Sequence, residues 1–364
     1  MTASRYSYIG GFDGTSNVLA GMLTGIPVKG TQAHSFISCF LGLSDLNTSV
    51  IASPAAGQPP VEFVSVVLAN LERLGYTNKT NEGELAAMIS YAQSFPTSFL
   101  ALVDTYDTLI SGVPNFLAVG WGLFEVGYKP IGIRLDSGDL AYLSVEARSL
   151  FLAADVVVGQ ELFATCTIIA SNDINEDVLL SLERAQHEID VFAIGTNLVT
   201  CQSQPALGCV YKLVEINGQA RIKLSQEMEK TVIPGRKNLY RLTGTQSKDC
   251  PLIDVMQLAT DPAPTVGQRL LCRHPFVENK RAHIIPATVT PLLVLQWNGP
   301  AGGRTRPVSS IEESKLRVFG QLQKMRPDHI RPLNPTPYKV ALEGELYDFM
   351  HQLWMNMAPI SDLT

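Results

Sequence analysis

This sequence of 364 residues has few of the features that mark secreted, membrane-spanning and nucleic-acid-binding proteins. Its six cysteines are spread thinly and form no Cys-x-x-Cys pair, which excludes a dense disulfide scaffold and favours reduced, structural thiols. No apolar run reaches the roughly 18 residues of a spanning helix, and no signal peptide is evident. The net charge of −6 gives no reason to expect nucleic acid or an anionic membrane as a partner. We therefore expect a soluble, cytosolic protein.

The apolar residues that are present predict an α/β protein with a packed core. Hydrophobic residues make up 46% of the chain and charged residues 17%, which suits one large barrel with an appendage or two modest domains. In the first two hundred residues, short runs of successive apolar residues are typical of strands covered on both faces. Helical patterns separate these runs, as in a parallel sheet or barrel. The predicted strands are 28–34, 99–104, 130–136, 167–171 and 191–195, and the helical patterns span 85–92, 116–126 and 174–182.

Polar, chemically capable residues stand at the end of every predicted strand. They lie at 31–35, 104–107, 134–139, 171–173 and 195–197. Ligands of parallel α/β folds bind at the carboxyl ends of the strands, where the loops converge. Asn172 and Asp173 can also cap the helix that follows them. Because an eight-stranded barrel does not close on five strands, we predict an irregular, incomplete parallel β/α barrel that carries the active site over residues 1–205.

The pattern changes beyond residue 205 and predicts a second, smaller α+β region over residues 206–364, resembling an open sandwich. Asn217-Gly218 separates two strand-like runs, at 211–216 and 219–224, and favours a tight hairpin turn. The Gly- and Pro-rich segment 298–303 is typical of an exposed loop. Helical patterns follow at 310–323 and 342–355.

Seven segments together resemble nicotinate phosphoribosyltransferases in their order and spacing. They are 8–17, 30–35, 102–108, 132–140, 171–174, 194–200 and 207–213, and the likeness fades past residue 250. The resemblance implies that family members carry a further N-terminal region, which completes the barrel and the second domain. That region also offers an aromatic side chain, across a homodimer, to stack on the pyridine ring. We therefore expect this chain to be an isoform, a fragment or an incomplete gene product.

The resemblance implies that nicotinate and phosphoribosyl pyrophosphate react to nicotinate mononucleotide and pyrophosphate, the first step of NAD synthesis from nicotinate. It assigns the nicotinate carboxylate to Arg134 and Thr31, and a planar guanidinium suits two parallel charge-assisted hydrogen bonds. It assigns ribose binding, and stabilisation of the positive charge that develops at C1, to Asp136. In the family, the histidine that matches His34 accepts a phosphoryl group from the co-substrate ATP. Without the family resemblance, Arg134 could as readily form a structural ion pair with Asp136 or Asp139. His34 could as readily be a core or capping residue.

Residues at two strand ends are expected to bind the phosphates of phosphoribosyl pyrophosphate. The residues are Ser171, Asn172, Asp173, Gly195 and Thr196, whose backbone N–H groups and hydroxyls can donate to phosphate; a plain tight turn is the alternative. Asp104 and Asp107 could bind ribose or position Mg²⁺, with Mn²⁺ as the other choice of metal, and Asp104 is the expected ligand. Helix capping is the alternative for both.

Two further functions remain open from the sequence. One is the nicotinamide-using relative, whose substrate has no carboxylate for Arg134 to bind. The other is a truncated, non-catalytic chain that is inert or only pairs with full-length subunits.

Overall fold

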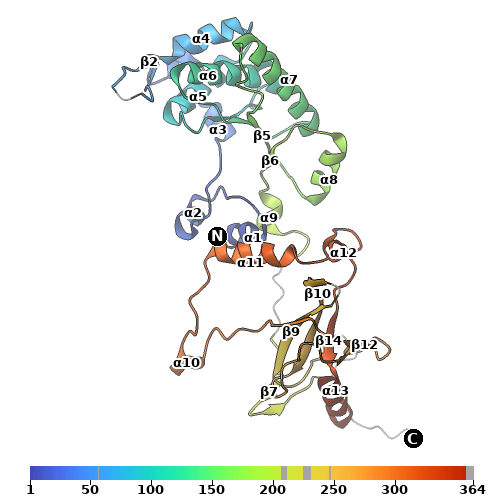
Figure 1. Ribbon diagram of the computed structural model, residues 1–364. Coiled ribbons are helices and arrows are strands. Elements are labelled where there is room, and N and C mark those ends of the chain that lie inside the picture. The colour runs from blue at the N-terminus through green and yellow to red at the C-terminus, as the bar shows by residue number, and fades with distance from the viewer. Residues whose placement is uncertain (56, 206–210, 224–230, 246, 358–364) are drawn as a thin grey trace, which may run out of the picture. The chain divides into compact units, whose positions relative to one another are not determined.

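The computed structural model describes residues 1–55, 57–205, 211–223, 231–245 and 247–357 and consists of two compact units (Figure 1). The first unit comprises Met1–Ser4 and Gly14–Ala206, and the second comprises Arg5–Asp13 and Leu207–Thr364. Helix α1 (Thr2–Gly10) ends in the second unit. The Tyr8 hydroxyl donates to Glu312 at 2.7 Å, and the Lys315 ammonium lies 3.9 Å from the centre of the Tyr8 ring. These contacts explain why Arg5–Asp13 belongs to the second unit.

A parallel sheet of four strands, in the order β3-β4-β5-β6, organises the first unit. The strands are β3 (Leu100–Leu102), β4 (Gly132–Leu135), β5 (Thr167–Ala170) and β6 (Val191–Phe192). They fall within four of the five predicted runs, so the parallel α/β class is confirmed. Among the described residues the sheet does not close into a barrel and has β3 and β6 at its edges.

The prediction of a strand at residues 28–34 is wrong. Val28 forms only an isolated bridge with Thr15, and the chain that follows it does not join the sheet. The side-chain oxygen of Gln32 instead accepts a hydrogen bond from the Leu102 N–H at 3.3 Å. Since that N–H is the donor a neighbouring strand would use, a side chain replaces the backbone ladder at this edge.

Helices α4 (Phe63–Arg73), α5 (Glu82–Ser94), α6 (Val113–Val126) and α7 (Leu140–Val158) form most of the core of this unit with the sheet. Together with the π-helical turn η2 (Thr108–Gly112), α6 makes an apolar stretch long enough to span a membrane by length and composition. However, 72% of its most apolar window is buried inside the unit, so its apolarity is that of a core helix.

The remaining elements of the first unit are short, apart from α8. They are α2 (Val18–Thr24), α3 (His34–Ile37), η1 (Leu43–Asp45), β1 (Val50–Ile51), β2 (Val61–Glu62), α8 (Glu176–Ala185) and α9 (Thr196–Thr200). The predicted cap of α8 by Asn172 and Asp173 is wrong, because the helix begins later. Its N-cap is Asn175, whose side chain accepts from the Val178 N–H at 3.0 Å.

The second unit contains a mixed sheet with the strand order β12-β11-β14-β10-β9-β13. Its strands are β9 (Lys237–Gly244), β10 (Ser247–Leu258), β11 (Leu270–Arg273), β12 (Arg281–Ile284), β13 (Thr288–Pro291) and β14 (Val340–Glu343). Only β10 and β14 pair in parallel. The helices are α10 (Gly299–Gly302), α11 (Ile311–Leu322), α12 (Pro327–Ile330) and α13 (Gly344–Met357), and α13 packs on β10, β11 and β14.

The predicted hairpin is confirmed but short, with β7 (Glu215–Ile216) and β8 (Gln219–Ala220). Asn217 and Gly218 have φ of 50° and 73°, as a type I′ turn requires, and residue 224 of the predicted second strand lies outside the described residues. The helical patterns at 310–323 and 342–355 correspond to α11 and α13. The segment 298–303 is largely exposed, as predicted, but it contains the single helical turn α10.

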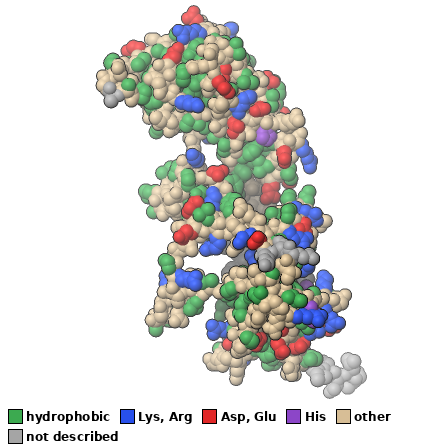
Figure 2. Space-filling view, viewed as in Figure 1, with side chains coloured by type: hydrophobic (Ala, Val, Ile, Leu, Met, Phe, Trp, Pro, Cys, Tyr) green, Lys and Arg blue, Asp and Glu red, His purple; other side chains and the backbone are tan. Residues whose placement is uncertain are grey.

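Five cysteines lie in the described part of the chain and all are unpaired; Cys209 lies outside it. Burial raises the pKa of the Cys166 and Cys272 thiols to about 12, so both stay protonated and inert at neutral pH. Figure 2 shows acidic and basic side chains interspersed on the visible face of the first unit, in keeping with the small net charge of −6.

Candidate active site

His34 is held between polar groups from two strand ends of the first unit. It opens α3, and its Nδ1 lies 3.1 Å from the Thr105 hydroxyl. Its Nε2 lies 3.3 Å from Oδ2 of Asp136 and 3.8 Å from Oδ1 of Asp104. The His34 side chain is 42% exposed, so a reactant can reach the ring.

These neighbours determine which ring nitrogen carries the proton. Ionised carboxylates only accept hydrogen bonds, so the nitrogen that faces Asp136 and Asp104 must be a donor. Nε2 of His34 therefore bears hydrogen, and in the neutral ring Nδ1 keeps the lone pair and accepts from Thr105. A neutral imidazole in this tautomer is a nucleophile at Nδ1.

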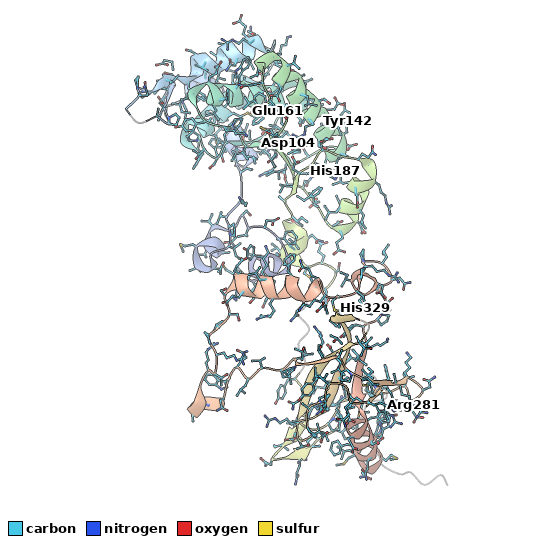
Figure 3. All side chains as sticks on the ribbon, in the orientation of Figure 1. Asp104, Tyr142, Glu161, His187, Arg281 and His329 are labelled. Carbon is cyan, nitrogen blue, oxygen red and sulfur yellow. The ribbon has the colours of Figure 1, made fainter. Side chains whose placement is uncertain are left out.

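Asp104 braces the loop after β4. Its side chain, labelled in Figure 3, is 1% exposed. Its Oδ2 accepts from the Asp136 N–H at 2.9 Å and from the Ser137 hydroxyl at 2.6 Å, whereas Oδ1 is buried without a hydrogen-bond partner in the described chain. Asp107, by contrast, caps η2 by accepting from the N–H groups of Leu109 and Ile110.

The expected metal role of Asp104 does not fit this arrangement. No group of three or more His, Cys, Asp or Glu side chains that could hold a metal ion occurs among the described residues. Asp104 itself offers one oxygen, in the interior. Since Mg²⁺ takes several oxygen ligands and keeps some of its waters, these residues do not form a cage for it.

Arg134 lies between Thr31 and Asp136. Its Nη1 donates to the Thr31 hydroxyl oxygen at 2.6 Å and to the Gln32 carbonyl at 3.2 Å. The ion pair with Asp136 is present but loose, at 3.6 Å between Nη2 and Oδ2, and Asp139 instead caps α7. Nε of Arg134 is buried with no partner among the described residues. Nη2 makes no hydrogen bond among the described residues and is thus the guanidinium nitrogen left for a carboxylate, whereas the buried Nε is closed to a ligand.

Of the predicted phosphate-binding residues in the described chain, only Ser171 hydrogen-bonds to the group formed by His34, Arg134 and Asp136. The Ser171 hydroxyl donates to Oδ1 of Asp136. Asn172 and Asp173 are exposed, with φ of 90° and 47°, a left-handed conformation that non-glycine residues adopt at some cost. Gly195 is the N-cap of α9 and Thr196 its first residue, and among the described residues no hydrogen bond or ion pair joins them to His34, Arg134 or Asp136. The pairing of β5 with β6 nevertheless brings the loops after both strands to the same sheet edge.

The sequence prediction missed three residues that hold this site together. Thr105 contacts His34, Ser137 contacts Asp104, and Gln32 ties the His34 segment to β3. The signal for Thr105 and Ser137 was present, since each adjoins an aspartate at a strand end. Gln32 is 8% exposed and lies beside Thr31, and only the fold shows what its side chain contacts.

Comparison with known proteins places this site in a family. Over 370 aligned residues the chain is 50% identical to nicotinate phosphoribosyltransferase 1 of Arabidopsis thaliana, covering 100% of this chain and 66% of that protein. It is 41% identical to the nicotinate phosphoribosyltransferase of Homo sapiens, covering 99% of this chain and 67% of the human protein. The chain belongs to the nicotinate phosphoribosyltransferase family.

Two further matches agree with this family. The nicotinate phosphoribosyltransferase C-terminal domain matches residues 236–350, so the expectation that the likeness fades past residue 250 is wrong. The crystal structure of human nicotinic acid phosphoribosyltransferase matches with a TM-score of 0.82 at 37% identity, over 97% of this chain and 67% of that one. The chain spans slightly less than two thirds of the length of the Arabidopsis relative.

Proposed function

We propose that this chain carries the active site of a nicotinate phosphoribosyltransferase. Its substrates would be nicotinate and phosphoribosyl pyrophosphate, and its products nicotinate mononucleotide and pyrophosphate. The pyridine nitrogen forms the bond to C1 of the ribose, and the bond from C1 to pyrophosphate breaks, with its electron pair leaving on pyrophosphate. The observation that carries the proposal is the position of Asp136, whose Oδ2 faces both the guanidinium of Arg134 and Nε2 of His34.

Arg134 and Thr31 supply the recognition of nicotinate. Nη2 of Arg134, which is only loosely paired with Asp136, donates to the carboxylate, while Thr31 holds Nη1 from the other side. Nicotinamide lacks the negative charge that this guanidinium would neutralise, so the site favours nicotinate over its amide. Asp136 supplies a negative charge close to the bound ring, where it stabilises positive charge as it grows at C1.

His34 supplies the coupling to ATP. Its Nδ1 lone pair attacks the γ-phosphorus of ATP, a nitrogen–phosphorus bond forms, and the bond to ADP breaks with its electron pair leaving on ADP. Asp136 and Asp104 stabilise the positive charge of the ring through the Nε2–H. Water later cleaves the nitrogen–phosphorus bond and releases phosphate.

The remaining partners follow from the same proposal. Ser171, Asn172, Asp173, Gly195 and Thr196 would lie against the phosphates of phosphoribosyl pyrophosphate. Mg²⁺ or Mn²⁺ would be coordinated by the phosphate groups of the substrates and not by protein ligands. The protein would act in the cytosol as a homodimer.

The test is phosphorylation of the purified chain by γ-³²P-labelled ATP. The expected label is acid-labile and base-stable, is lost in His34→Ala and persists in His283→Ala, which removes an exposed histidine of β12. Labelling that survives His34→Ala contradicts the assignment of the acceptor. Formation of nicotinate mononucleotide by the same sample separates the enzyme from a non-catalytic chain, whose turnover would be absent.

A further inference from the structure

The first turn of α5 lies between the two segments that meet at His34. Oε1 of Glu82 accepts from the Leu43 N–H at 3.1 Å. A Cβ atom on Gly83 would lie 2.3 Å from the Phe40 carbonyl oxygen, so the backbones touch there. Both contacts are made to the segment that continues from α3, the helix that His34 begins.

Glu84, one residue further, reaches the other segment. It is 0% exposed, and its Oε2 accepts from the Ser111 hydroxyl at 2.5 Å and from the Asn115 amide at 3.2 Å. The Ser111 oxygen in turn accepts the Asn81 N–H at 2.9 Å, so the start of α5 and η2 share one buried network.

The network lies directly behind the end of β3. Gly112 follows Ser111, and a Cβ atom on it would lie 1.8 Å from the Val103 carbonyl oxygen. The next residues along the chain from Val103 are Asp104 and Thr105, which face the ring of His34. A displacement of η2 is therefore transmitted to these two side chains through backbone contact.

We propose that Glu84 is a positioning residue for the phosphoryl-accepting histidine, holding η2 and the end of β3 in place so that Asp104 and Thr105 fix the orientation and tautomer of the His34 ring. The inference rests on the proposed function in that His34 is taken as the acceptor. It adds a residue that touches neither substrate nor the reacting atoms.

The chemistry of Glu84 is unusual for a residue that only packs. Burial raises the pKa of its carboxyl from 4.5 to about 7, hydrogen bonds from Ser111 and Asn115 lower it, and the charges of Asp104 and Asp107 raise it further. Oε1 is buried without a partner in the described chain. Since an apolar side chain of similar volume avoids this desolvation cost, packing alone does not account for an acid here.

A first-turn acid also stabilises a helix through the helix dipole, and this is the competing explanation. Glu82 already supplies such a charge at the same helix end, from a more exposed position. A purely stabilising role predicts that removing Glu84 lowers stability and leaves His34 unchanged. The two explanations therefore differ in the state of the His34 ring.

The experiment records the ¹⁵N shifts of the His34 ring in the full chain labelled with ¹⁵N-histidine, for the native protein, Glu84→Ala and Glu84→Gln. The signals are assigned with His34→Ala. In the native chain the two nitrogens should have well-separated shifts, as one protonated tautomer requires. Glu84→Ala should move the shifts of both His34 ring nitrogens toward those of the exposed His283. It should also slow phosphorylation of the chain by labelled ATP on the order of tenfold to a hundredfold. Glu84→Gln keeps an oxygen for Ser111 and should retain the native shifts.

A matched control separates positioning from stability. Phe151→Leu leaves a small cavity in the core of the same unit and should lower the melting temperature without moving the His34 shifts. If Glu84→Ala does not fold, Ser111→Ala replaces it, and a change in the same direction is expected. A folded Glu84→Ala or Ser111→Ala chain with native His34 shifts overturns the proposal. Because the shifts need no ATP, a native chain that takes up no label counts against the proposed function alone.

Discussion

The Thr31 hydroxyl lies 2.6 Å from Nη1 of Arg134, which fixes one side of the guanidinium from a segment that is not itself a strand. The Thr31 hydroxyl also donates to the Gln32 carbonyl at 3.2 Å. Because Thr31 and the Gln32 carbonyl hold Nη1, Nη2 of Arg134 is oriented before any ligand arrives.

Replacement of Arg134 by lysine should weaken nicotinate binding by roughly 1.5–3 kcal/mol, since an ammonium on a flexible stem does not reproduce a planar guanidinium that is already oriented by Thr31. Calorimetric titration with nicotinate and with nicotinamide measures the effect. The weak binding of nicotinamide should change little. Arg148→Lys, which alters an arginine paired with Asp190 on the first unit, is the control. An equal loss of binding affinity for nicotinate and for nicotinamide would show that Arg134 does not contact the carboxylate.

Glu84 should make stability depend on pH. Its pKa is about 7 in the folded protein and ordinarily 4.5, so its contribution to folding is complete below pH 4.5 and is lost as the pH rises through 7. The loss amounts to about 3 kcal/mol. Glu84→Gln does not ionise, so the native chain should lose about 3 kcal/mol relative to this variant between pH 4.5 and pH 8. Urea unfolding of both chains at the two pH values measures the difference, and a constant difference would refute the raised pKa.

Gly112→Ala should destabilise the first unit by about 2 kcal/mol or more, because the added methyl group would meet the Val103 carbonyl. Gly320→Ala is a matched control in α11, where a Cβ atom meets nothing within 4 Å. That change should be neutral or stabilising by up to about 1 kcal/mol. Thermal unfolding followed by circular dichroism compares them, and a Gly112→Ala chain as stable as the native one would contradict the close packing of η2 on β3.

Asn175→Ala should cost about 1 kcal/mol through loss of the cap of α8. Glu183→Ala, an exposed change later in the same helix, should lie within about 0.5 kcal/mol of the native chain. Chemical unfolding distinguishes the two. The assignment of Asn175 as the N-cap fails if its replacement costs no more than that of Glu183.

The differences between prediction and structure have a common cause. Segment 28–34 carries apolar and β-branched residues as a strand does, but the Leu102 N–H of β3 donates its hydrogen bond to the Gln32 side chain. Likewise Asn172, Asp173 and Asn175 are all residues that cap helices, and periodicity alone does not say which of them is next to the first turn. Local patterns describe preference, whereas the pairing of donors and acceptors depends on residues far away in the chain.

Sequence patterns were enough to predict the alternation of buried strands and helices, and with it the edge at which polar residues gather, because burial on both faces requires continuous apolar runs. They also placed His34, Arg134 and Asp136 among the residues at that edge. The folded chain was needed to show that the Asp104 side chain is buried and holds the loop after β4, that Thr105 faces the His34 ring, and that Glu84 binds Ser111 next to the close approach of Gly112 to Val103. Those roles depend on distances between residues dozens of positions apart, which periodicity and propensity do not encode.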